Sequence, residues 1–170
     1  MAAPRIKAAG LQARPGYIPD MRRLLPFILL FAALLICILV WVRAAPVAVA
    51  DWHVSPASAA SPSGAEVQIV GDKAPAFAAP PEKLVSVLVE IAASKRRLRI
   101  LANTASPHRI TIEVRSKWLG FPDYMTFEAV PQANGTRIEV LARSRFAGYD
   151  WGVNSARTAH WIDQVREALR

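Results

Sequence analysis

The sequence predicts an α+β fold in which an antiparallel meander of four to five strands packs against two helices, preceded by one transmembrane helix. Three observations favour this fold: an uncharged apolar run at residues 24–42, short alternating segments separated by turn residues between positions 98 and 142, and helical spacing of apolar residues on either side of those segments. A chain of 170 residues has room for one compact domain beside the apolar run. We therefore expect a single domain over residues 66–170.

The apolar run at residues 24–42 contains no charged side chain. As a helix it would span about 28 Å, close to the ~30 Å hydrocarbon core of a bilayer. Pro26 is expected in the first turn, where its missing N–H removes no helical hydrogen bond, and Trp41 is expected at the membrane interface. We predict a single-pass transmembrane helix here, with the lipid bilayer as its partner.

The distribution of positive charge indicates the orientation of that helix. Residues 1–23 carry five Lys and Arg against one Asp, which is half of the formal net charge of +8. Basic residues mark the cytoplasmic flank of a membrane helix. We predict a cytoplasmic basic tail at residues 1–23 and a periplasmic carboxyl-terminal domain, at the inner membrane of a bacterium. The basic residues of the domain itself are scattered among acidic ones, which argues against nucleic acid as a partner.

A cleaved signal peptide is the alternative to an anchor, because residues 48–50 resemble a cleavage site and residues 22–23 a basic leader. The apolar run is longer than the roughly 7 to 15 residues usual in signal peptides. We favour the anchor, and cleavage after Ala50 stays open, as does the choice between Met1 and Met21 as the true start.

Residues 43–65 are rich in Ala, Pro and Ser and show no sustained period, so we predict a tether between the membrane helix and the domain. The domain should begin with a short strand at residues 66–70. A helix is expected next, because Pro81 suits its first position and apolar residues recur on one face, namely Leu84, Val87, Leu88, Ile91 and Ala92. Three basic residues, 95–97, fall at its end, where they would complement the helix dipole.

Four strands should follow this helix. Alternating apolar residues bounded by turn residues predict them at residues 98–102, 110–115, 124–130 and 136–142. The dipeptide Asn134-Gly135 predicts a tight hairpin turn between the last two strands. A final helix is predicted from Asn154, a good N-cap residue, with apolar residues at helical spacing as far as Leu169.

The sequence contains no complete catalytic or cofactor-binding constellation, so we predict neither a cofactor nor a metal. Cys37 is the only cysteine and lies within the apolar run, which excludes thiolate catalysis and cysteine zinc sites from the domain. The three histidines, His53, His108 and His160, lack the close spacing of zinc ligands. The chain also lacks a Gly-x-Ser-x-Gly nucleophile elbow and a glycine-rich phosphate loop.

Two segments hold an unusual density of Gly, Asp, Arg and aromatic residues. The first, residues 120–123, precedes a strand, and the second runs from Ser144 into the last helix. In these segments the chain resembles the domain of unknown function 1499 family of bacterial proteins, over residues 73–169. The resemblance implies no activity, because that family has none assigned. Its pattern falls on Gly120, Pro122, Asp123, Ser144, Arg145, Gly148, Asp150, Gly152, Asn154 and Arg157.

These motif residues have a structural and a functional interpretation. In the structural one, Asp150 and Asn154 cap the last helix, the glycines allow positive φ and the arginines hold the loop in place. Asp123, Asp150, Arg145 and Arg157 are also expected to form a cluster of ion pairs. In the functional one, Arg143, Arg145 and Arg157 bind an anion or a lipid headgroup beside the amino end of that helix. We favour the structural interpretation because it explains every residue type without a ligand.

The order of elements also resembles that of helix-grip lipid-binding domains, in which a curved sheet wraps the last helix around an apolar pocket. This is an analogy at the level of the fold. Trp118, Phe121 and Trp151 would then lie at a pocket mouth or a membrane surface, although ordinary packing of these aromatic side chains is the simpler expectation.

We predict a non-enzymatic, membrane-tethered interaction or ligand-binding module of the bacterial cell envelope, with another envelope protein or a lipid as its partner. The first alternative is a helix-grip-like carrier of a hydrophobic or anionic lipid. The second is an enzyme that acts on an envelope substrate through Asp123 and Asp150.

Overall fold

The computed structural model describes residues 21–60, 62–146 and 148–170. By its contacts the chain divides into two compact units, Met1–Cys37 and Ile38–Arg170. The basic tail predicted at residues 1–23 lies, up to residue 20, outside the described residues. Helix α1, Met21–Ala44, runs from the first unit into the second, so its last residues belong to the same unit as the sheet.

Helix α1 contains the whole predicted apolar run. It is long and apolar enough to cross a membrane, and a signal sequence would share both properties. The helix begins at Met21, three residues before the predicted start, so Pro26 lies inside it and not in its first turn. Pro26 therefore removes one main-chain hydrogen bond of the helix, contrary to the expectation from the sequence.

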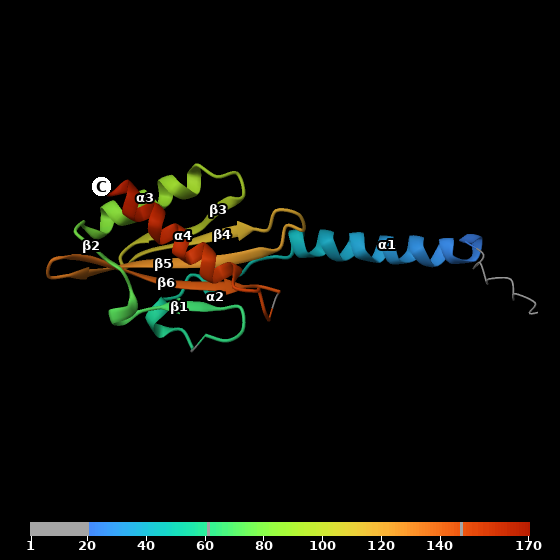
Figure 1. Cartoon of the computed structure of the whole chain (residues 1–170), viewed down its shortest axis with the longest axis horizontal. Helices are drawn as coiled ribbons and strands as arrows, with labels where there is room; N and C mark the ends of the chain where they lie inside the picture. The colour runs from blue at the N-terminus through green and yellow to red at the C-terminus, as the bar shows by residue number, and fades with distance from the viewer. Residues whose placement is uncertain (1–20, 61, 147) are drawn as a thin grey trace, which may run out of the picture. The chain divides into compact units, whose positions relative to one another are not determined.

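A six-stranded antiparallel sheet forms the centre of the second unit (Figure 1). Its strands are β1 (Val67–Ile69), β2 (Ala76–Phe77), β3 (Leu98–Ala105), β4 (His108–Arg115), β5 (Pro122–Gln132) and β6 (Gly135–Ser144). Their order across the sheet is β1-β6-β5-β4-β3, and the short β2 also pairs with β6. The predicted α+β class and the meander from β3 to β6 are confirmed.

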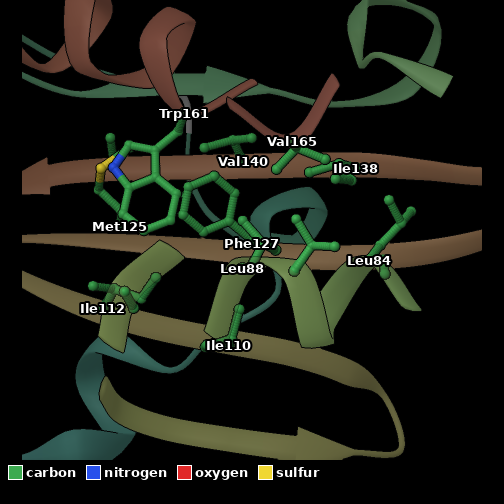
Figure 2. Close-up of a cluster of buried hydrophobic side chains, with 14 of the residues drawn as sticks. Leu84, Leu88, Ile110, Ile112, Met125, Phe127, Ile138, Val140, Trp161 and Val165 are labelled. Carbon is green, nitrogen blue, oxygen red and sulfur yellow. The ribbon is translucent and has the colours of Figure 1, made fainter. Parts of the chain in front are cut away.

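Helices α3 (Pro81–Ala93) and α4 (Val153–Ala168) cover one face of this sheet, and apolar side chains fill the space between the two layers (Figure 2). The indole ring of Trp161 lies 5.3 Å from the ring of Phe127 at the centre of the cluster. The cluster includes Leu84, Leu88, Ile110, Ile112, Met125, Phe127, Ile138, Val140, Trp161 and Val165. Burying each of these large apolar side chains contributes about 1.5–3 kcal/mol, so this layer holds the main core.

Within residues 43–65, which the sequence predicts to be a tether, the part from Ala45 to Ser58 packs on the opposite face of the sheet. This part includes helix α2 (Val49–Trp52) and the 3₁₀ turn Pro56–Ser58. Thr126 donates to the Trp52 carbonyl at 2.9 Å, and His53 Nδ1 lies 2.8 Å from Thr111 Oγ1. The sequence gives no sign of this packing, because its contacts use main-chain carbonyls and polar side chains, which leave no hydrophobic period.

The predicted hairpin between β5 and β6 is present, but its two-residue loop lies one residue earlier in the chain than the predicted dipeptide Asn134-Gly135. Gln132 pairs with Gly135, so Ala133 and Asn134 form the loop. Gly135 has a φ of 136°, and a Cβ atom there would lie 2.1 Å from the carbonyl oxygen of Phe77. The glycine is therefore required by the close approach of β2 and belongs to the strand.

Candidate functional site

The motif residues meet at one end of the sheet, where β5 begins, β6 ends and α4 starts. Asp123 and Ser144 are paired residues of β5 and β6, and Ser144 Oγ donates to Asp123 Oδ1 at 2.7 Å. Arg157 of α4 donates to Asp123 Oδ2 and to the side-chain oxygen of Asn154, both at 2.8 Å. Asn154 in turn donates to Ser144 Oγ at 3.1 Å and to the Ala65 carbonyl at 2.8 Å. We call Asp123, Ser144, Asn154 and Arg157 the motif network.

Asn154 does not cap α4, contrary to the structural interpretation of the sequence. The helix begins at Val153, so Asn154 already has a helical main chain, and its fully buried side chain joins the motif network. Gly152 is the N-cap residue, and the carboxylate of Asp150, two residues earlier, accepts hydrogen bonds from the main-chain N–H groups of Gly152 (3.0 Å) and Asn154 (2.7 Å). Asp150 thus orders the start of α4, and Asn154 ties that start to β6 and to Ala65, two residues before β1.

Of the charged motif residues, Asp123 and Arg157 form an ion pair, and Arg145 lies elsewhere. The Arg145 guanidinium donates to the main-chain carbonyls of Ala45 at 3.2 Å and Pro46 at 2.7 Å. It therefore fastens the segment after α1 to the end of β6, and neither of the motif aspartates is its partner.

Arg143, two residues before Arg145 and within β6, has a similar role. Its guanidinium donates to the carbonyls of Asp51 (3.1 Å) and Trp52 (3.0 Å) and lies 4.7 Å from the centre of the Trp52 ring. Arg143 and Arg145 thus hold the segment behind the sheet, whereas Arg157 faces the motif network. The structure does not bring the three arginines of the predicted anion site together, because Arg143 and Arg145 donate to carbonyls of the segment after α1, whereas Arg157 donates to Asp123 and Asn154.

The glycines and the proline of the motif shape the two loops around the motif network. Gly120 and Gly152 adopt positive φ angles, and Pro122 is buried at the start of β5. The carbonyl of Gly148 lies so close to Gly64 that a Cβ atom on Gly64 would be 1.9 Å from its oxygen. The role of Gly64 is not apparent in the sequence, since only the fold brings this residue, three before β1, against the connection from β6 to α4.

A pocket of about 500 Å³ lies beside the motif network, between the end of α3, the end of β4 and α4. Arg157 belongs to both the pocket and the motif network. The residues that line the pocket include six basic side chains and no acidic one; the basic ones are Lys95, Arg96, Arg97, Arg115, Lys117 and Arg157. We call this feature the cationic pocket.

The positive charge of the cationic pocket is only partly compensated. Arg115 pairs with the buried carboxylate of Glu113, and Arg157 pairs with Asp123 at 2.8 Å. Among the described residues, the other four basic side chains form no ion pair; these are Lys95, which donates to the side-chain oxygen of Gln164, and Arg96, Arg97 and Lys117. An anion in the pocket would therefore meet several guanidinium donors, which bind phosphate and carboxylate groups strongly.

The sequence predicts that residues 95–97 lie at the end of the preceding helix and complement its dipole. Helix α3 ends at Ala93, with Ser94 as its C-cap, so the three basic residues lie beyond its last turn. Their placement in one pocket with Arg115 and Arg157 depends on strand pairing and on the packing of α4. The sequence alone could signal only the local run of charge.

A second polar network lies on the opposite face of the sheet. His53 lies between Thr111 Oγ1 (2.8 Å) and Thr104 Oγ1 (3.3 Å), and Thr111 also bonds to Thr126 at 2.9 Å. Burial lowers the pKa of His53, the nearby charge of Arg109 lowers it further, and a carboxylate on β5 partly opposes both effects. His53 is therefore held neutral in the folded protein over a wider pH range than a free histidine.

Histidine and carboxylate side chains form no metal-binding cluster of three or more within the residues that the structure describes. His108 lies 3.2 Å from a carboxylate oxygen of Glu82, and His160 is exposed on α4. Each histidine thus has a separate environment.

Two of the three aromatic residues singled out in the sequence are strongly exposed, so the expectation of ordinary packing is wrong for them. Trp118 is 80% exposed and Trp151 is 84% exposed, whereas Phe121 is half-buried. The space between the sheet and α4 is occupied by core side chains such as Trp161 and Phe127 (Figure 2). The exposed tryptophans therefore lie outside that layer.

Comparison with protein-family models shows which family this chain belongs to. The model of a family described as "Protein of unknown function (DUF1499)" matches residues 53–165. The chain belongs to the DUF1499 family. No match was found among the curated proteins or among the solved structures. The DUF1499 match begins at His53, inside the segment predicted as a tether, and it includes the motif network and every basic residue of the cationic pocket.

Proposed function

We propose that this DUF1499 protein is a membrane-anchored, non-enzymatic module of the bacterial cell envelope that binds an anionic ligand in the cationic pocket. The observation that carries the proposal is a pocket of about 500 Å³ whose lining has six basic side chains and no acidic one. A pocket of this size suits a small ligand or a headgroup. Phosphate or carboxylate groups are the expected chemistry, because arginine forks match their geometry.

Retention of α1 as an anchor is supported by the way its last turn packs. Val42 is buried within the second unit, and Ala45, directly after the helix, is nearly as buried. The Arg43 side chain donates to the Trp118 carbonyl at 3.4 Å, and Ala45 supplies a carbonyl to Arg145. A chain cut after Ala50 would lose all of these contacts. We infer that α1 stays attached and that the domain lies on the periplasmic side, as the basic residues before α1 favour.

A binding role accounts for both motif aspartates without catalysis. Asp123 accepts hydrogen bonds from Ser144 and Arg157, and Asp150 accepts two from the main chain at the start of α4. Each carboxylate thus has a structural task. These contacts support a binding module over an enzyme that would use the same two side chains.

Titration of the full-length protein with inorganic pyrophosphate tests the proposal directly. Isothermal titration calorimetry in a neutral detergent at low ionic strength should show binding. Replacing two exposed cations of the pocket, Arg96→Gln with Arg97→Gln, should weaken binding by at least about tenfold, because each charge-assisted hydrogen bond contributes roughly 1.5–3 kcal/mol when fully formed.

The matched control removes two basic side chains outside the pocket, Arg166→Gln with Arg170→Gln, at exposed positions near the end of the chain. Both double variants change the net charge equally. The control should bind pyrophosphate within about twofold of the parent, since Arg166 and Arg170 do not line the pocket and would donate no hydrogen bond to the ligand. Equal losses in the two variants, or no binding by the parent protein, would refute a defined anion site.

A further inference from the structure

The second unit carries a set of exposed aromatic and apolar side chains on the two loops at one end of its sheet. One loop precedes β5 and the other follows β6, and these strands are paired neighbours at Asp123 and Ser144. The rings of Phe121 and Phe146 lie 6.3 Å apart and join the loops. We call the set the aromatic rim: Trp118, Leu119, Phe146, Tyr149 and Trp151.

The aromatic rim lies beside the end of α1. The ring of Trp41 lies 5.5 Å from that of Phe146, and Arg43 donates to the Trp118 carbonyl at 3.4 Å. Both residues of α1 belong to the same compact unit as the sheet. The rim is thus located beside the end of the uncharged apolar run of α1.

The chemistry of the rim matches a lipid headgroup layer. Tryptophan and tyrosine favour the membrane interface, because their rings are apolar while their N–H and O–H groups prefer water. Lys117 lies 4.8 Å from the centre of the Trp118 ring, and Arg43 is adjacent, so cations accompany the aromatic side chains. Such cations attract anionic headgroups within a Debye length of the surface.

We propose that the aromatic rim inserts into the headgroup region of the bilayer that α1 enters, so that the domain rests on the membrane surface. The proposal rests on the anchoring of α1 inferred above, and it adds a second membrane contact made by the folded domain. Three observations carry it: the exposure of Trp118 and Trp151, the continuity of the rim with Trp41 and Arg43, and the accompanying positive charge.

Site-directed spin labelling of the full chain tests this contact. In a Cys37→Ala background, labels are introduced at Trp118→Cys and Tyr149→Cys, one on each loop, in vesicles of equal amounts of phosphatidylcholine and phosphatidylglycerol. The ratio of collision rates with oxygen and with a water-soluble nickel complex reports depth. We expect this ratio to be several-fold higher at both positions than at Ala133→Cys, an exposed site in the hairpin at the opposite end of β5.

Water-like ratios at positions 118 and 149, equal to that at 133, would overturn the membrane contact. If the protein fails to sediment with the vesicles, the anchor itself is wrong, which distinguishes the two failures. A second measurement needs no label: quenching of tryptophan fluorescence by brominated phosphatidylcholine should fall when Trp118→Phe and Trp151→Phe are combined. Unchanged quenching would also contradict the proposal.

Discussion

At the residue scale, arginine side chains hold this domain together through main-chain carbonyls as much as through carboxylates. Arg143 and Arg145 each bind two carbonyl oxygens of the segment after α1. A guanidinium presents five N–H donors in a rigid plane and can serve two acceptors at once, which a lysine ammonium does less well. Arg157 applies the same geometry to Asp123 and Asn154.

Asn154 offers the sharpest test at this scale, because the sequence predicted a cap and the structure shows a buried junction. Asn154→Ala leaves the Ala65 carbonyl and Arg157 short of a partner, so it should lower the free energy of unfolding by about 2–3 kcal/mol. Asp150→Ala removes a helix cap and should cost about 1 kcal/mol. Urea unfolding of the full chain in detergent, followed by fluorescence, measures both.

Asp163→Ala is the control for this pair, since Asp163 lies on the exposed side of α4 in a surface ion pair. Its effect should stay below about 0.5 kcal/mol. Equal losses for Asn154→Ala and Asp150→Ala would mean that Asn154 contributes no more than a cap does.

At the scale of elements, the segment from Ala45 to Ser58 acts as a third layer behind the sheet. It buries polar side chains of β4 and β5, among them Thr111 and Thr126. These threonines alternate with core residues along their strands, so both faces of the central strands are covered. The layer is held by hydrogen bonds more than by apolar burial, which makes its attachment sensitive to the charge state of His53.

His53 should make the stability of the domain depend on pH. Its pKa is lowered in the folded state from the ordinary 6.5, so the unfolded chain binds more protons than the folded one as the pH falls below about 6.5. Stability should therefore be fully present above pH 6.5 and decline as the pH falls toward the lowered folded-state value. Melting temperatures measured from pH 7.5 down to pH 5.5 should show this decline.

Replacing His53 by Asn should flatten the pH profile over that range, even if the variant is less stable throughout. His160→Asn provides the control, because His160 is exposed on α4, and its profile should follow that of the parent. A parent melting temperature that is constant from pH 7.5 to pH 5.5 would exclude the proposed role of His53.

At the scale of the whole molecule, the helix and the domain share residues. The last turn of α1 belongs to the compact unit of the sheet, and the segment after it lies on that sheet. There is thus little free chain between the helix and the domain, and the domain should stay close to the membrane surface if α1 is an anchor.

A fluorescent or enzymatic reporter fused after Arg170 tests the anchor and its orientation. The full-length fusion should sediment with membranes, resist extraction by carbonate and be reached by protease only from the periplasmic side, because the basic residues lie before α1. A released product that begins at Asp51 would show signal-peptide cleavage. Protection from periplasmic protease would reverse the orientation.

The sequence by itself determined the elements whose residues carry a period or a turn of their own. Burial of one face of a helix or strand leaves a repeating pattern of apolar residues in the sequence. The sequence therefore predicted the apolar run of α1, the buried faces of α3 and α4, and the alternation in β4 to β6. The resemblance seen in residues 120–123 and from Ser144 onward led to the correct family. It also supplied the residues that meet in the motif network.

Only the tertiary structure decided which partners those residues have. Packing of residues 45–59 behind the sheet, the buried role of Asn154, the dispersal of three arginines and the cationic pocket all depend on groups far apart in the chain. Every residue has a main-chain carbonyl whatever its side chain, so the contacts of Arg143 and Arg145 with carbonyls could not be predicted from any sequence pattern. The physical reason is that hydrophobic periodicity records which side of an element is buried, but it does not record what covers that side.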